Sequence, residues 1–129
     1  MSEDHPNVRI LKLFDPTDVP GTVGVFAEDA VFHYYNPRLP DLHGDYVGHA
    51  GIRSFFDKLE TMTGDAFRPN IVSINALGDE LVVIHRKQQI NMGACRIEVD
   101  VVVVWRIVEG QIAEVWDIPS VHTACVLEP

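Results

Sequence analysis

The sequence has 129 residues, of which 47% are hydrophobic, and a formal net charge of −9 from ten Lys and Arg against nineteen Asp and Glu. A chain of this length and composition can bury one hydrophobic core, so we expect a single domain. The acidic balance argues against nucleic acid and against anionic membrane surfaces as partners.

Three helices are predicted in the first half of the chain. Asn7 can cap a short first helix that ends before Pro16, and Asp18 can cap a short second helix. The third and longest is predicted from Ala50 to about Thr63, with Gly64 placed to end it. Its apolar residues form one stripe at helical spacing, as in a helix that packs one face on a core: Ile52, Phe55, Phe56, Leu59 and Met62.

After residue 64 the apolar residues change from helical spacing to alternation, which predicts strands. Four strands are expected, at 67–77, 81–91, 95–108 and 111–118, with Gly-bearing turns between them. Such close spacing predicts an antiparallel meander. A further strand is expected at 30–35, between the second and third helices.

Two segments carry no predicted helix or strand. Residues 41–49 form a long loop, and long loops in compact domains are often lids or rims of sites. Residues 119–129 lack helical periodicity, so we expect a loose tail or a strap across the mouth of a pocket. The expected organisation is one domain over residues 1–129, with a core at about 7–118.

Nothing in the sequence points to export, a membrane, a metal or a cofactor. Residues 1–7 are acidic and polar, unlike a secretory signal, and the longest strongly apolar run, 101–105, is too short to cross a bilayer. Cys95 and Cys125 fit no disulfide framework, the histidines match no ligand spacing, and no Gly-rich phosphate loop is present. We therefore expect a cytoplasmic protein with no metal, no cofactor and no membrane partner.

Three phrases and the order of the elements resemble one known superfamily. The phrases are Phe-Ala-Glu-Asp-Ala-Val-Phe at 26–32, Gly-His-Ala-Gly-Ile at 48–52, and Val-Trp-Arg-Ile at 104–107 with Glu-Gly-Gln-Ile shortly after it. They resemble the nuclear transport factor 2-like superfamily and, within it, SnoaL-like proteins, over residues 7–118. The resemblance implies an α+β fold: a strongly curved antiparallel sheet forms a cone-shaped half-barrel, and three helices cap it around a pocket.

Alternation along the strands predicts which side chains face that pocket. In the 81–91 strand the alternate set that includes Arg86 is the more apolar one, and in the 95–108 strand the odd-numbered set is apolar, so both are placed inward. In the first and last strands we place inward the sets that hold Tyr34 and Asp117. The polar side chains expected to converge in the cavity are Tyr34, Asn36, Arg86, Gln88 and Asp117.

Asp117 is the only carboxylate placed inward on the sheet, and it is the predicted acid–base group. An apolar cavity raises the pKa of a carboxyl group and a nearby Arg lowers it, and such tuning suits acid–base catalysis. Arg86 is expected to pair with Asp117, because an unpaired buried ion is costly; a purely structural ion pair is the alternative. The predicted catalytic residues are Asp117, Arg86 and Tyr34, and the predicted substrate-binding residues are Asn36, Gln88, Phe32, Val103 and Trp105.

The resemblance implies particular chemistries for such a pocket. SnoaL-type polyketide cyclases use one Asp as acid and base in an apolar pocket without a cofactor, and Asp117 matches that Asp. Limonene-type epoxide hydrolases hold a water with a Tyr-x-Asn pair and a final-strand Asp, which Tyr34, Asn36 and Asp117 match. Gln88 stands where their second Asp would fall, and an amide cannot deliver the proton. Ketosteroid isomerases fit worse, since their oxyanion-hole Asp would fall at Val103.

The sequence therefore predicts a pocket for a small, largely apolar organic ligand, with cofactor-free catalysis of polyketide cyclase or isomerase type through Asp117. One alternative is a non-catalytic ligand-binding or assembly module of the same fold, and another is limonene-type epoxide hydrolysis with an altered acid. A homodimer is also expected, because the outward sheet face carries apolar side chains that are unfavourable in water: Val102, Val104, Ile112 and Trp116.

Overall fold

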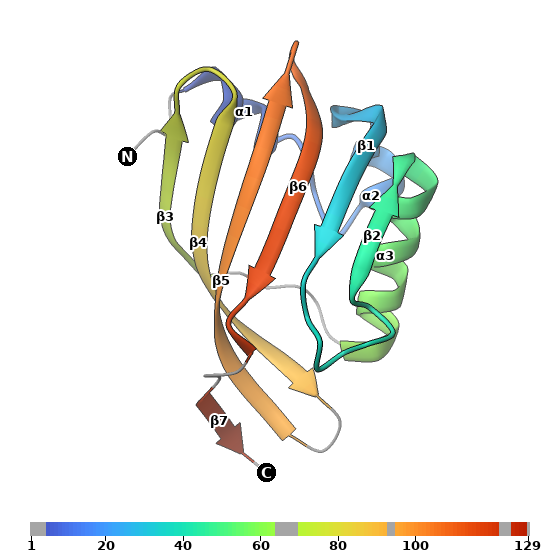
Figure 1. The fold of residues 1–129 in the computed structure, drawn as a ribbon, viewed down its shortest axis with the longest axis vertical. Coiled ribbons are helices and arrows are strands. Elements are labelled where there is room, and N and C mark those ends of the chain that lie inside the picture. The colour runs from blue at the N-terminus through green and yellow to red at the C-terminus, as the bar shows by residue number, and fades with distance from the viewer. Residues whose placement is uncertain (1–4, 64–69, 93–94, 122–124, 129) are drawn as a thin grey trace.

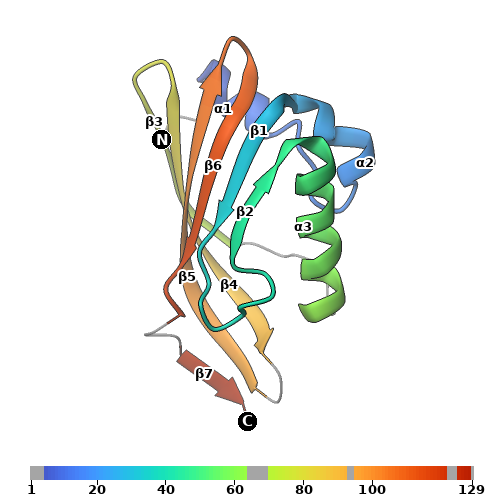
Figure 2. The same cartoon turned by 45° about the vertical axis from the view of Figure 1, so that its right-hand side comes forward.

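A curved sheet of seven strands carries the helices on its concave side (Figures 1 and 2). The computed structural model describes residues 5–63, 70–92, 95–121 and 125–128. The helices are α1 (Pro6–Leu11), α2 (Val19–Thr22), the 3-10 helix η1 (Val23–Val25) and α3 (Gly48–Thr63). The strands are β1 (Phe26–Tyr34), β2 (Gly44–Val47), β3 (Asn70–Leu77), β4 (Leu81–Met92), β5 (Cys95–Val108), β6 (Gln111–Pro119) and β7 (Cys125–Glu128).

The strands lie in the order β2-β1-β6-β5-β4-β3, and β7 pairs with β5. The meander from β3 to β6 is antiparallel, as predicted. β1 instead pairs with β6 in parallel, so the sheet as a whole is mixed. This follows from the chain path: after β1 the chain forms β2 and α3 and reaches the far edge at β3, and the meander then returns β6 to the side of β1.

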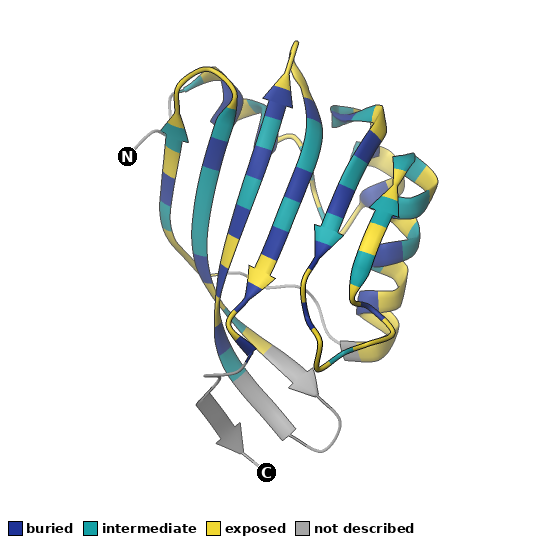
Figure 3. Cartoon of the chain, viewed as in Figure 1, coloured by how far each residue is buried: buried dark blue, intermediate teal, exposed yellow. Residues whose placement is uncertain are grey.

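Strand alternation sorts the two faces of the sheet largely as predicted (Figure 3). On β5 the odd-numbered side chains from 99 to 107 are buried, and on β4 Val82 and Arg86 are buried. Ile112 is an exception: it was predicted on the outward face and is fully buried. The register between β5 and β6 shifts between Arg106 and Ile107, so the alternation along β6 breaks and both Ile112 and Val115 point into the core.

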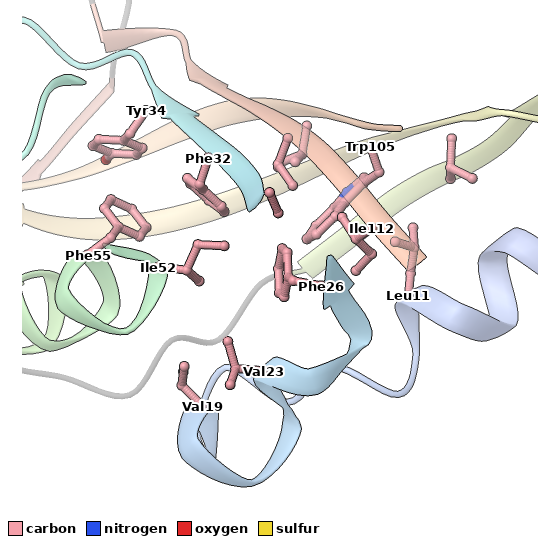
Figure 4. Close-up of a cluster of buried hydrophobic side chains, with 14 of the residues drawn as sticks. Leu11, Val19, Val23, Phe26, Phe32, Tyr34, Ile52, Phe55, Trp105 and Ile112 are labelled. Atoms are coloured by element: carbon pink, nitrogen blue, oxygen red, sulfur yellow. The ribbon is translucent and has the colours of Figure 1, made fainter. Parts of the chain in front are cut away.

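The core lies between the concave face of the sheet and α3 (Figure 4). Ile52 and Phe55 on α3 are buried, and Phe55 packs on Phe32 of β1 with ring centroids 4.7 Å apart. Helix α3 approaches β2 closely at Gly51, where a Cβ atom would lie 3.2 Å from the backbone of Tyr46. A side chain there would require the neighbouring backbone to move by a few tenths of an ångström.

The first two helices are shorter than predicted, and the first has a different cap. His5, not Asn7, caps α1, with its ring nitrogen accepting from the backbone N–H of Asn7. The amide of Asn7 is used elsewhere: it donates to the carbonyl of Asp79 in the β3–β4 turn at 2.9 Å and ties α1 to the sheet. Asp18 caps α2 as predicted, but the helix ends after one turn and β1 begins at residue 26, earlier than predicted.

Two segments predicted to lack regular structure contain strands. The predicted loop 41–49 includes β2, which pairs antiparallel with β1 at the sheet edge. The predicted tail 119–129 includes β7, which pairs with the early part of β5. Neither segment has the long alternating apolar run on which strand prediction depends. Within the described residues, no helix combines the length and the apolar character needed to cross a membrane.

Candidate functional site

A cavity of about 230 Å³ lies between the concave face of the sheet and the helices. Its wall is mainly apolar, as is typical of small-molecule sites, with a few polar groups among the apolar side chains. The apolar wall comes from α1 and the segment after it, from α3 and from the strands: Val8, Leu11, Phe14, Pro16, Phe32, Phe55, Phe56, Leu59, Ile71, Ile74, Ile84, Val101, Trp105 and Pro119. The polar side chains in the wall are Lys12, Tyr34, Arg86, Gln88 and Asp117.

Strand register brings the polar groups of β1, β4 and β6 together. Tyr34 on β1 lies beside Asp117 on β6 in the parallel pair. Asp117 in turn lies opposite Val103 on β5, and Val103 lies opposite Ile84 on β4. Arg86 is two residues further along β4 on the same face. The three groups therefore come from distant parts of the sequence but meet on one patch of the concave face.

Asp117 and Arg86 form the ion pair that the sequence predicts. The guanidinium Nη2 of Arg86 donates to Oδ2 of Asp117 at 3.2 Å, and both side chains are about nine-tenths buried. Burial raises the pKa of the Asp117 carboxyl group, and the charge of Arg86 and its hydrogen bond oppose that rise. Burial likewise lowers the pKa of Arg86, while Asp117 acts to raise it. Asp117 is thus a buried carboxyl group that can hold or release a proton beside a fixed cation.

Tyr34 stands next to this pair as a hydrogen-bond donor. Burial, together with the smaller effect of the Asp117 charge, raises its pKa to about 12, so its hydroxyl group keeps its proton at neutral pH. The side-chain amide of Asn36 donates to the Tyr34 hydroxyl oxygen at 3.1 Å, and the ring of Phe55 packs on the Tyr34 ring (Figure 4). These contacts fix the position of the Tyr34 ring and leave its O–H available to a ligand oxygen.

Six of the eight predicted site residues line the cavity, and two do not. The lining residues are Asp117, Arg86, Tyr34, Gln88, Phe32 and Trp105. Asn36 is fully buried and reaches the cavity only through its hydrogen bond to Tyr34. Val103 is also buried, as part of the core beneath the polar groups. Among the described residues, no three His, Cys, Asp or Glu side chains gather as they would to hold a metal ion.

Two parts of the wall were not predicted from the sequence. One is the contribution of α1 and the segment after it, which includes Leu11, Lys12 and Phe14. The tether from Asn7 to Asp79 holds α1 over the cavity, and a contact across 72 positions has no local signal. The other part is the apolar stripe of α3, where Phe55 and Leu59 line the cavity. The stripe predicted that this face is buried but not that it borders a cavity.

A second polar cluster lies on the opposite, outer face of the sheet. The two ring nitrogens of His33 each lie 2.6 Å from a carboxylate oxygen, one on Asp45 and one on Glu114. Arg106 also contacts Glu114, at 3.3 Å. The ring of Trp116 stacks with His33 and lies under the guanidinium of Arg106. This cluster links β2, β1, β6 and β5 but does not reach the cavity.

Solved structures of other proteins share this fold. Similar ones include TerC crystallised with polyporic acid (TM-score 0.76, 22% identity, covering 91% of this chain and 93% of that one). A nuclear transport factor 2-like protein of unknown function from Burkholderia pseudomallei has a TM-score of 0.78 and 20% identity (91% and 92% covered). An epoxide hydrolase from M. tuberculosis, similar to limonene epoxide hydrolase, has a TM-score of 0.65 and 20% identity (91% and 84% covered).

These likenesses establish the nuclear transport factor 2-like fold, as the sequence predicted. The family is given by the sequence itself, because the family model of the SnoaL-like domain matches residues 8–115. The chain belongs to the SnoaL-like family. No curated protein matches it significantly.

Proposed function

We propose that the chain is a small-molecule pocket protein that carries out cofactor-free acid–base catalysis through Asp117, of the polyketide cyclase or isomerase type. The observation that carries this proposal is the position of Asp117. It is the only carboxylate among the described residues that line the cavity, it is buried, and it pairs with Arg86 at 3.2 Å. A carboxyl group with a raised pKa in an apolar site is suited to take and return a proton near neutral pH.

The neighbouring groups suggest the order of events. Ionised Asp117 would remove a proton from a carbon beside a ligand carbonyl, and the electron pair of the broken C–H bond would move onto the carbonyl oxygen. The Tyr34 hydroxyl and the Arg86 guanidinium would stabilise the resulting enolate by hydrogen bonding and charge. Asp117 would then return the proton to another atom of the ligand. No oxidant or metal enters this sequence of steps, because protons and electron pairs balance within ligand and protein.

The likeness to TerC supports a small ligand, since that protein crystallised with polyporic acid. The non-catalytic alternative, a ligand-binding or assembly module, keeps the cavity but assigns Asp117 and Arg86 a structural role. Epoxide hydrolysis is less well supported, because Asn36 does not line the cavity and Gln88 replaces the acid that would protonate an epoxide. A cytoplasmic location stays a prediction from the sequence.

The test is deuterium exchange at the carbon beside a carbonyl, which needs only a ketone that fits the cavity. Indanone, tetralone and acetylnaphthalene are incubated with the protein in heavy water, and exchange is followed by NMR. We expect exchange above background for at least one ketone, and a loss on the order of 100-fold in Asp117→Asn, which keeps the shape but removes the base.

The matched control is Asp100→Asn, which removes a carboxylate from the exposed, outer side of β5. It should exchange at the wild-type rate. Ketones that bind to the wild-type protein without any exchange would support the non-catalytic alternative. Exchange that survives in Asp117→Asn would remove Asp117 from the mechanism.

We also propose that the outer face of the sheet forms a homodimer interface. Val102 and Ile118 on this face are 39% and 46% exposed, and Val104 and Trp116 beside them are half-buried. An apolar patch of this kind favours a second copy over water. Analytical ultracentrifugation at protein concentrations of tens of micromolar should give the mass of a dimer, and Ile118→Lys should shift it towards the monomer. A wild-type monomer under these conditions would overturn the interface.

A further inference from the structure

The cavity has an identifiable mouth. Of the described residues that line it, only Lys12 and Ile71 are exposed to solvent, and the others are buried or half-buried. Lys12 follows the last residue of α1, and Ile71 lies near the beginning of β3. The cavity therefore opens between these two points, and Lys12 is the charged group at the opening.

No acidic side chain among the described residues forms an ion pair with Lys12. Within the described part of the chain, its side chain forms neither an ion pair nor a hydrogen bond, whereas the other cation in the wall, Arg86, lies 3.2 Å from Asp117. The cavity thus has an inner end where opposite charges balance and an outer end with an excess positive charge. An anionic group at the inner end would lose its water and face Asp117, but at the mouth it would stay hydrated and meet Lys12.

From this polarity we infer the class of ligand: an amphiphile with an apolar ring body inside the cavity and an anionic group, such as a carboxylate, held at the mouth by Lys12. The volume of about 230 Å³ is below the range of roughly 300–1,000 Å³ typical of drug-sized ligands, so the body is one ring or two fused rings. This inference rests on the proposed function, because it assumes that the cavity takes a small organic molecule. It adds the ligand's charge and its orientation.

The overall charge of the protein makes the inference testable. A chain with a net charge of −9 repels anions at long range, so a preference for an anionic ligand has to come from a local contact. The two probes are naphthoate and naphthamide, which have the same ring body and differ in charge at one end. Their affinities are measured by isothermal titration calorimetry at low ionic strength, with wild-type protein and three variants.

The first variant, Lys12→Met, removes the charge but keeps a flexible apolar side chain, and the second, Lys12→Glu, reverses the charge. The third is the matched control Arg9→Met, which removes a cation from an exposed position on α1, one turn before Lys12, that does not line the cavity. We expect wild-type and Arg9→Met proteins to bind naphthoate about threefold to tenfold more tightly than naphthamide. The preference should disappear in Lys12→Met and reverse in Lys12→Glu. Added salt should reduce the preference in the wild-type and Arg9→Met proteins and the reversed preference in Lys12→Glu.

A preference for naphthoate that persists in Lys12→Met, or that Arg9→Met removes equally, would overturn the inference. So would equal binding of the two probes by the wild-type protein, which would leave the proposed pocket function intact. Failure of both probes to bind would instead contradict the proposed function, and the inference with it.

Discussion

Asp117 and Arg86 are buried together, and each reduces the cost of burying the other. Taking an isolated charge out of water costs several kcal/mol, and a close partner offsets part of that cost. Nη2 of Arg86 lies 3.2 Å from Oδ2 of Asp117, and both side chains line the largely apolar cavity. Its stability therefore depends on both members, and removal of one leaves an unpaired group in a site that cannot solvate it.

A double-mutant cycle tests this coupling. Arg86→Met alone should destabilise the fold by about 3–5 kcal/mol, because it leaves Asp117 buried without its partner. Asp117→Val alone should cost a similar amount, whereas the double variant should cost much less than the sum of the two. The measurement is the free energy of unfolding from urea titrations of the four proteins. Simple additivity would show that the two side chains do not interact.

At the scale of elements, the outer-face polar cluster around His33 holds three neighbouring strands together. His33 lies on β1, and its ring contacts Asp45 on the short edge strand β2 and Glu114 on β6. It therefore connects the two strands that flank β1. A neutral imidazole has only one N–H, so donation to both Asp45 and Glu114 requires the protonated ring. Partial burial lowers the pKa of His33, but the hydrogen bonds and charges of Glu114 and Asp45 outweigh it, and the pKa is raised above the ordinary value of 6.5.

The raised pKa of His33 determines how the stability of the fold changes with pH. Because the pKa of His33 is higher in the folded state, its protonation stabilises the fold fully below the unfolded-state pKa, and this contribution is lost as pH rises through the folded-state pKa. Wild-type protein should therefore lose stability to urea as the pH rises from below 6.5 through the raised pKa of His33. His33→Gln should be less stable at the lower pH and should show a smaller change with pH. An unchanged slope in the variant would exclude His33 as its source.

The turn between β5 and β6 contains a local strain that can be relieved. Glu109 and Gly110 both have positive φ angles, 51° and 79°, which is the pattern of a two-residue type I′ hairpin turn. Glycine adopts this conformation freely, but glutamate does so at a cost, and asparagine tolerates it better. Glu109→Asn should raise the free energy of unfolding by about 0.5 kcal/mol, measured by urea titration. No gain, or a loss, would contradict the assignment of strain to Glu109.

At the scale of the whole molecule, the sequence predicted which strand side chains face the cavity better than it predicted the segments that enclose the cavity. Alternation along regular strands was enough to place Tyr34, Arg86 and Asp117 on one face, because the period of two holds over each of those strands. It failed for Ile112, where a register shift interrupts the period. It also gave no sign that Asn7 ties α1 over the cavity, since this contact is set by tertiary structure.

The strongly negative net charge of the chain does not extend to the described wall of the cavity, where the charged side chains are Lys12, Arg86 and Asp117. Nineteen Asp and Glu residues give the chain a strongly negative field, yet Asp117 is the single carboxylate among the described residues of the cavity wall. Its pKa therefore decides whether the cavity holds a mobile proton, as catalysis requires, or a permanently ionised structural pair.

The most direct test of the proposed acid–base role is to measure the pKa of Asp117. The carboxyl carbons of protein labelled with carbon-13 in Asp are followed by NMR as pH is varied, and Asp117→Asn assigns the signal. We predict that Asp117 titrates above the ordinary value of 3.8, because burial outweighs the effect of Arg86, and that Arg86→Met raises the pKa further. A pKa at or below 3.8 would mean that Asp117 is a permanently ionised structural partner of Arg86, and it would contradict the proposed acid–base role.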